Sequence, residues 1–268
     1  MKIHVISAGH FSPLLSNRLW SRQSLSCNCL VIEDQKRIVL VDTGLHPQML
    51  KSNLGSQIYN KTLGVKTSAE STLKVQVEKL DLNLESVSDV ILTHLHPDHT
   101  AGLVEFPNAQ VHLSKAEWDY VNELAEDSYY KKHFDRTHWQ HTQKFNFHQN
   151  FNFDWFGFKA ERLDFLSSET YLVLLPGHTG GGHCGVAIKF QQQWVFHVGD
   201  AYFLRDDLNE NLKDRHILSE VIQASISPNS VLRLKTAKKI ADIKKELGNQ
   251  LILISAHEEK DSNQLFNE

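Results

Sequence analysis

The stretch ILTHLHPDHTAGL, residues 91–103, places three histidines and an aspartate within six positions, directly behind an apolar run. These side chains are His94, His96, Asp98 and His99. Imidazole and carboxylate groups crowded at the end of a buried strand cost desolvation free energy unless something pairs with them. A bound metal cation is such a partner, so the stretch predicts a metal site.

The spacing inside this stretch indicates two cations. On a strand, His94 and His96 project to the same side, because side chains alternate. Pro97 ends the strand and suits the first turn of a helix, so Asp98 and His99 leave in a different direction. Two pairs of ligands aimed at adjacent points predict a dinuclear site, and their nitrogen and oxygen donors suit zinc, iron or manganese.

Further histidines and aspartates follow other predicted buried strands. His178 lies in LLPGHTGGG, and Asp42, Asp200 and His257 end the runs RIVLVD, WVFHVGD and LILISAH. Loops at the carboxyl ends of such strands converge, so we expect these side chains to join the first four.

The local patterns predict layered sheets with helices outside. Strands are expected at 2–7, 29–34, 37–42, 87–93, 109–114, 170–177, 185–190, 194–200 and 251–257, and helices at 68–81, 115–127 and 230–248. Residues 129–158 are rich in aromatic and histidine side chains without clear periodicity, which fits either a pocket lining or a loop packed on the surface.

The ordered series of histidines and aspartates resembles the metallo-β-lactamase superfamily, from about residue 30 to residue 257. The resemblance implies an α/β fold, an αββα sandwich of two mixed β-sheets flanked by helices. It would form one domain over residues 1–268, with a variable aromatic-rich insertion at about 115–165.

The resemblance also implies how the ligands divide between the two ions. His94, His96 and His178 would hold one ion, Asp98, His99 and His257 would hold the other, and Asp200 would bridge them. Asp42 is expected to orient a ligand through a hydrogen bond, as metal sites generally require. Two divalent ions are implied, zinc first, with iron or manganese as alternatives.

Two such ions, roughly 3.5–4 Å apart, share a water, lower its pKa and polarise the electrophile. The predicted reaction is attack of a metal-bridging hydroxide on an ester or lactone carbonyl, with Asp98 passing a proton to the leaving group. Superfamily members that reduce oxygen or nitric oxide carry a glutamate at the position of the second histidine of the motif. This chain has His96 there, which favours hydrolysis.

Within the superfamily, the motifs VLVDTGL, THLHPDHTAGL, PGHTGGGH and GDAYF look most like N-acyl homoserine lactonases. Such lactonases use a tyrosine shortly after the bridging aspartate to assist the substrate carbonyl. Tyr202 is the predicted counterpart, although it lies two residues after Asp200, where the lactonases use three. The glycine-rich loop between His178 and His183 is also one residue longer.

Three other reactions remain open. A thioesterase of the glyoxalase II kind would need basic residues near its C-terminus, for which the candidates are Lys235, Lys238, Lys239, Lys244 and Lys245. A phosphodiesterase would need a positive groove, which a net charge of −4 disfavours. A mononuclear-iron sulfur dioxygenase would use a subset of the same ligands. A non-catalytic binding protein would be expected to lose ligands, and all seven are present.

The predicted partner is a small-molecule substrate with an apolar or aromatic portion. The negative net charge disfavours nucleic acid, and no apolar run reaches the length of a membrane span. The start MKIHVISAGHF is too short in apolar residues for a secretory signal, so a cytoplasmic location is expected. Residues 11–25, which include Leu14 and Trp20, are a candidate oligomer interface or pocket lid.

Overall fold

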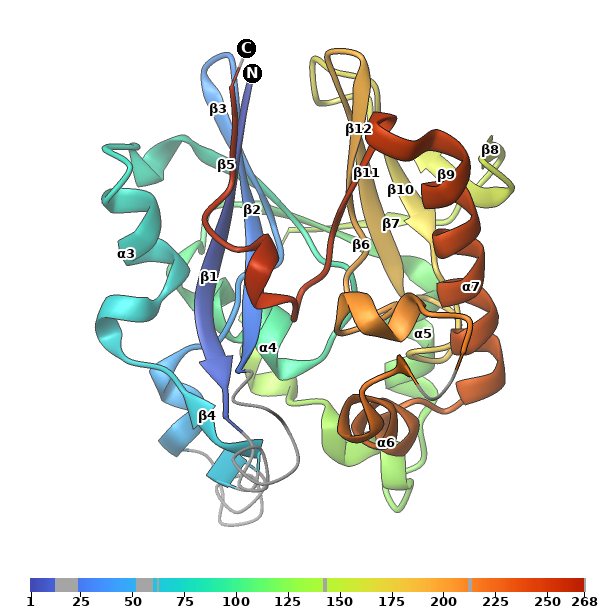
Figure 1. Cartoon of the computed structure of the whole chain (residues 1–268). Coiled ribbons are helices and arrows are strands. Elements are labelled where there is room, and N and C mark those ends of the chain that lie inside the picture. Colours follow the sequence, from blue (N-terminus) through green and yellow to red (C-terminus); the bar gives the residue numbers. More distant parts are fainter. Residues whose placement is uncertain (13–23, 52–59, 62, 142–143, 212–213, 268) are drawn as a thin grey trace.

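The computed structural model describes residues 1–12, 24–51, 60–61, 63–141, 144–211 and 214–267. Two β-sheets face each other, and helices cover their outer faces (Figure 1). Both termini lie at the same end of the sandwich, opposite the end where α4 and α6 lie (Figure 1). The predicted αββα sandwich with mixed sheets is confirmed.

The first sheet has the strand order β14-β1-β2-β3-β5-β6-β7, with β4 paired to β1. Strands β1, β2 and β3 are antiparallel neighbours, whereas β3, β5, β6 and β7 run parallel. The bounds are β1 Lys2–Phe11, β2 Leu25–Asp34, β3 Arg37–Val41, β4 Val65–Lys66, β5 Val87–Ile91, β6 Gln110–Ser114, β7 Phe145–His148 and β14 Leu265–Asn267.

The second sheet has the order β13-β12-β11-β10-β9-β8. Its strands are antiparallel neighbours except for the parallel pair β12 and β13. The bounds are β8 Phe153–Trp155, β9 Phe158–Arg162, β10 Thr170–Leu174, β11 Cys184–Phe190, β12 Gln193–His197 and β13 Leu251–Ile254.

Apolar side chains from both sheets fill the space between them. Ile91 of β5 packs in this layer with Val186 of β11 and Ile254 of β13. The preceding residue of β5, Val90, points to the opposite face and packs against Leu73 of a covering helix. The central strands are thus buried on both faces, which explains why their sequences are almost wholly apolar.

Helices cover the outer faces and follow the predicted periodicity. The helix expected at 68–81 is found as α3, Leu73–Glu78, and the one at 230–248 as α7, Ser230–Leu247. The expected helix at 115–127 is α5, Lys115–Glu123. Strand β5 ends at Ile91, two residues before the predicted end, and α4, Pro97–Thr100, begins at the proline.

Some of the strands and one helix were not predicted from the sequence. Strands β7, β8 and β9 fall within the stretch expected as an insertion at about 115–165, and they extend both sheets. Helix α6, Ile217–Ile226, was not expected. Leu14 and Trp20, the candidate interface or lid, lie outside the described residues. Among the described helices, none combines the length and apolar composition needed to cross a membrane.

The backbone after α4 packs tightly against the loop that follows β3. A Cβ atom at Gly102 would lie 2.4 Å from the carbonyl oxygen of Thr43. The same loop is bound to the neighbouring helix, because the Thr43 amide and hydroxyl both donate to the carbonyl of His99, at 2.9 and 2.8 Å. Gly102 therefore allows the close approach that places His99.

Replacing Gly102 by alanine should therefore destabilise the protein by about 1–3 kcal/mol, because the added methyl group forces two backbone segments apart. Urea unfolding measures this free energy. Val104→Ala, on the exposed side of the same segment, should change it by less than about 1 kcal/mol. Equal stability of the Gly102→Ala variant and the unaltered protein would contradict the tight approach.

Candidate metal centre

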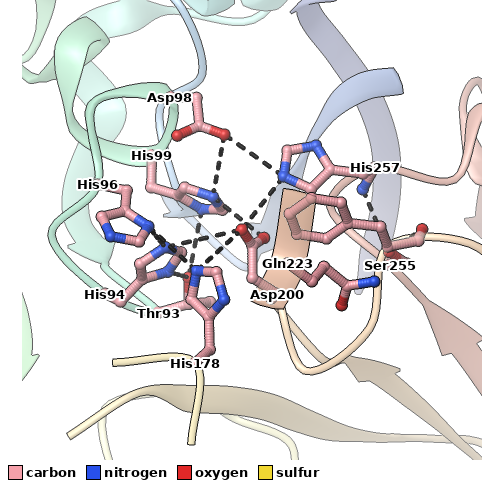
Figure 2. A network of polar contacts seen from close by, with 12 residues as sticks. Thr93, His94, His96, Asp98, His99, His178, Asp200, Gln223, Ser255 and His257 are labelled. Carbon is pink, nitrogen blue, oxygen red and sulfur yellow. Dashed lines mark hydrogen bonds and ion pairs between the residues drawn. The ribbon is translucent and has the colours of Figure 1, made fainter. Parts of the chain in front are cut away.

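The predicted ligand residues all lie in loops or a short helix at one end of the sandwich. His94 and His96 occupy the loop between β5 and α4, and α4 carries Asp98 and His99. The remaining three follow strands of the second sheet, namely His178 after β10, Asp200 after β12 and His257 after β13. The structure thus brings together all seven (Figure 2).

Three imidazole rings form the first group. Nδ1 of His96 lies 2.9 Å from Nε2 of His94 and 3.0 Å from Nε2 of His178. A carboxylate oxygen of Asp200 completes the group, at 3.2 Å from His178 Nε2 and 3.8 Å from His94 Nε2. These four ligand atoms lie close enough to surround one ion.

The second group shares Asp200 with the first. His257 Nε2 lies 3.2 Å from Asp200 Oδ2 and 3.4 Å from Asp98 Oδ2. His99 Nε2 lies 3.2 Å from Asp200 Oδ1 and 3.4 Å from Asp98 Oδ2. Figure 2 shows the carboxylate of Asp200 between the two groups, the position a bridging ligand would take.

These spacings suit coordination better than hydrogen bonding. Ligands bound tetrahedrally at about 2.0–2.1 Å lie about 3.3 Å from one another. The separations within the second group, 3.2–3.4 Å, match the edges of such a tetrahedron. His99 Nε2 and Asp200 Oδ1 are buried and lack a hydrogen-bond partner among the described residues. A pair of divalent cations would satisfy these atoms.

The protonation states of the first group also suit metal binding. Burial is the main cause that holds the pKa of His94 and His178 well below the usual range, and it lowers the pKa of His96 to about 3. These rings are therefore neutral at physiological pH, as imidazole ligands must be. The pKa of Asp200 is also well below its usual value: burial opposes ionisation, but the charges of His257 and His99 outweigh it.

Asp42 orients two of the histidines. His99 Nδ1 donates to Asp42 Oδ2 at 2.8 Å, which leaves Nε2 directed at the cluster. The Thr93 hydroxyl donates to the same carboxylate at 2.9 Å and lies 3.0 Å from Nδ1 of His94. A hydroxyl that donates to Asp42 can still accept a hydrogen bond from the Nδ1–H group of His94, so Nε2 of that ring is also left free for a ligand role.

Other contacts that the sequence did not reveal fix the remaining ligands. His257 Nδ1 donates to the carbonyl of Ser26 on β2 at 2.8 Å. His183 donates through Nδ1 to the Leu175 carbonyl, and its Nε2 accepts from the Asp200 amide at 2.9 Å. Ser26 lies 231 residues from His257, and Asp200 lies 17 residues from His183, so no local pattern predicts these two contacts.

A cavity opens beside the cluster. Its polar floor includes His96, Asp98, Asp200 and His257, and its walls come from segments that are far apart in the chain. The other lining residues are Phe11, Leu25, Met49, Asn60, Leu63, Pro97, His133, Phe203, Ile222 and Ile226. Among the described residues, neither lysine nor arginine lines it, so the cavity suits an uncharged, largely apolar ligand.

Tyr202 does not lie among the lining residues. Its side chain is buried in the apolar layer beneath α7. Burial raises the pKa of Tyr202 well above the usual value, and the charge of Asp261 raises it further. Phe203, three residues after Asp200, faces the cavity instead, and it has no hydroxyl. The predicted catalytic role of Tyr202 therefore finds no geometric support.

One cavity residue comes from the aromatic stretch. His133 is buried and ends a 3₁₀ turn, Tyr129–His133, and its ring lies edge-on to His96, with 6.2 Å between ring centroids. The sequence left open whether residues 129–158 line a pocket or pack on the surface, and His133 lines the cavity. The segment has no periodicity that could have revealed its direction.

The family model of the metallo-beta-lactamase superfamily matches residues 23–238. The chain therefore belongs to the metallo-β-lactamase superfamily. A probable metallo-hydrolase of Mycobacterium tuberculosis is 28% identical over 239 residues, which cover 88% of this chain and 75% of that protein. The N-acyl homoserine lactonase AiiB of Rhizobium rhizogenes is 34% identical over 98 residues, 35% of this chain and 33% of that protein.

Solved lactonase structures share the fold. A Bacillus thuringiensis AiiA variant with N-decanoyl-L-homoserine at its active site gives a TM-score of 0.69 at 17% identity, covering 97% of this chain and 94% of that one. The dizinc quorum-quenching lactonase AidC gives 0.59 at 19% identity, covering 88% and 74%. At these identities the likeness concerns the fold alone.

Removing the Asp42 carboxylate should destabilise the protein strongly. Asp42→Ala leaves buried donors of Thr93 and His99 without their acceptor, so we expect a loss of about 3–5 kcal/mol in the free energy of unfolding. Urea unfolding in the presence of a chelator measures it without metal. Glu126→Ala, whose side chain is 89% exposed, serves as control and should stay within about 0.5 kcal/mol. A similarly small change in the free energy of unfolding for Asp42→Ala would refute the role of Asp42 in holding His99 and Thr93.

Proposed function

We propose that the protein is a dinuclear metal-dependent hydrolase that cleaves an ester or lactone. The observation that carries this proposal is the pair of histidine and aspartate groups sharing Asp200 at the floor of an apolar cavity. The proposed ligands are His94, His96 and His178 for one ion, Asp98, His99 and His257 for the other, and Asp200 for both. Zinc is the first choice, with iron or manganese as alternatives.

Two divalent ions held there would lower the pKa of a shared water and polarise the substrate carbonyl. The residues of the chain supply position and proton transfer. The cavity walls hold the apolar part of the substrate so that its carbonyl lies over Asp200. Because Phe203 replaces a hydroxyl-bearing side chain at the wall, the chain offers no phenol to the carbonyl from this position.

Asp98 is the proposed proton carrier. Its carboxylate lines the cavity, and its contacts to His99 and His257 both run through Oδ2. Burial opposes its ionisation, but the charges of His99 and His257 lower the pKa of Asp98. In the hydrolysis, the hydroxyl of water bonds to the acyl carbon, the acyl carbon–oxygen bond breaks, and Asp98 delivers the proton to the departing oxygen.

The cavity favours a neutral carbonyl substrate over the alternatives. The lysines that a glutathione thioesterase would need lie on α7, where Lys238 pairs with Asp242 and Lys239 contacts the Gly157 carbonyl, and none of the five candidates lines the cavity. A phosphodiester anion would likewise find no cationic wall among the described residues. A single-iron dioxygenase would leave the second ligand group without a role.

The test is hydrolysis of a medium-chain N-acyl homoserine lactone by protein loaded with zinc, manganese or iron. Proton release measures the rate of this hydrolysis. His96→Ala should lower turnover at least about 100-fold and reduce the metal content, because a ligand nitrogen is lost while the fold persists. The exposed His10 on β1 gives the matched control, and His10→Ala should keep both values.

Parallel assays with a thioester and a phosphodiester separate the alternatives. Turnover of the lactone that disappears in His96→Ala supports the proposal. Faster turnover of the thioester or phosphodiester would replace the ester or lactone assignment. Full activity and normal metal content in His96→Ala would refute the ligand assignment itself.

A further inference from the structure

A buried glutamate joins the two loops that carry the first ligand group. Glu117 lies in the first turn of α5 and is completely buried, yet it does not line the cavity. We propose that Glu117 is a positioning residue that fixes the geometry of one metal position. This inference rests on the metal positions of the proposed function and adds a residue outside the ligand set.

The contacts of the carboxylate carry the argument. Glu117 Oε1 accepts from the backbone amide of Leu95 at 3.2 Å, and Oε2 accepts from the hydroxyl of Thr179 at 2.5 Å. Leu95 stands between His94 and His96, and Thr179 directly follows His178. One side chain therefore connects the two loops that supply all three histidines of the first group.

These two loops have no common origin. The first follows β5 in one sheet, and the second follows β10 in the other. A change in the relative position of the sheets would therefore change the distances among the three rings. The helix α5 belongs to neither loop, and its carboxylate can hold both at once because it has two oxygen atoms.

The glycine-rich loop provides a second, independent observation. A Cβ atom at Gly182 would lie 2.0 Å from the backbone nitrogen of Glu117, and one at Gly180 would lie 1.9 Å from the ring of Tyr120. Residues with side chains could not bring this loop so close to α5. The glycines thus allow the loop after His178 to rest on the helix, where Thr179 reaches the carboxylate.

The energetics indicate that this carboxylate is not kept for stability alone. Burial raises the pKa of Glu117 to about 7, and the bonds from Thr179 and Leu95 offset only part of that effect. A buried acid with such a pKa costs folding free energy when it ionises, and an apolar side chain of similar size would avoid this cost. A positioning role accounts for the acid at this place.

The experiment measures metal binding, so it needs no substrate. The metal-free protein is titrated with Co²⁺, whose absorption spectrum reports ligand geometry, and zinc affinity is measured by competition with a chelator. Glu117→Met removes both acceptors while keeping the side-chain length. Glu117→Gln keeps one acceptor for Leu95 and offers a donor to Thr179, whose hydroxyl can reverse its direction.

We expect Glu117→Met to lose about 10–100-fold in affinity for one of the two ions, with an altered cobalt spectrum, and Glu117→Gln to recover most of it. Asp34 gives the matched control, because it is buried and its carboxylate accepts from the amide and the hydroxyl of Ser167, far from the cluster. Asp34→Leu should affect stability and leave the affinity and the spectrum unchanged.

Wild-type affinity and spectrum in Glu117→Met would overturn the proposal, as would an equal loss of affinity in Asp34→Leu. If Glu117→Met does not fold, Thr179→Val replaces it as the test. This variant removes one of the two hydrogen bonds to Glu117 and should weaken the binding of one ion. Unchanged metal binding would overturn the positioning role of Glu117. A wild-type protein that binds two ions but hydrolyses none of the three substrates refutes the proposed function. The metal affinities of the Glu117 and Thr179 variants still test the positioning role of Glu117 in that case. Failure of the wild-type protein to bind Co²⁺ overturns both.

Discussion

The carboxylate of Asp200 lies buried among imidazole rings at the end of an apolar sandwich, and the arrangement of the site depends on it. Its oxygens approach His99 and His257 on one side and His178 on the other, all within 3.2 Å. Such a group needs compensating positive charge, because desolvating it alone costs several kcal/mol. That need draws histidines from three loops and the short helix α4 to one point, and it is the same need that two divalent cations would meet.

Two features of the sandwich hold the ligands in place: the strands before the ligand loops, and braces, which are buried carboxylates outside the ligand set that accept hydrogen bonds from those loops. The strands that precede the ligand loops finish at the same end of the sandwich, so these loops begin close together. Asp42 then holds His99 and, through Thr93, His94, whereas Glu117 connects the loops of His96 and His178. Both braces are buried carboxylates that accept two or more donors. The two-oxygen acceptor is well suited to this task, because a single group can join segments from different parts of the chain.

The cavity is built on a different principle from the cluster. Phe11 and Leu25 come from the first two strands, Phe203 from the loop after β12, and Ile222 and Ile226 from α6. Apolar walls of this kind select by shape and hydrophobicity, so changes in them alter the substrate without disturbing the ligands. Phe203, three residues after Asp200, contributes an aromatic ring without a hydroxyl to this wall.

The sequence by itself determined which residue types form the polar floor of the cavity, and it determined the class of the fold. The spacing His94-x-His96-x-Asp98-His99 and the polar residues His178, Asp200 and His257 lie next to strands that the local sequence predicts. Side-chain alternation and proline at a helix start are short-range effects, so a local pattern shows them. The tertiary structure alone decided the rest. The placement of β7 to β9, the direction of His133, the burial of Tyr202 and the contacts of Glu117 depend on segments tens of residues apart. Packing between distant segments sets these features, and no local pattern encodes it.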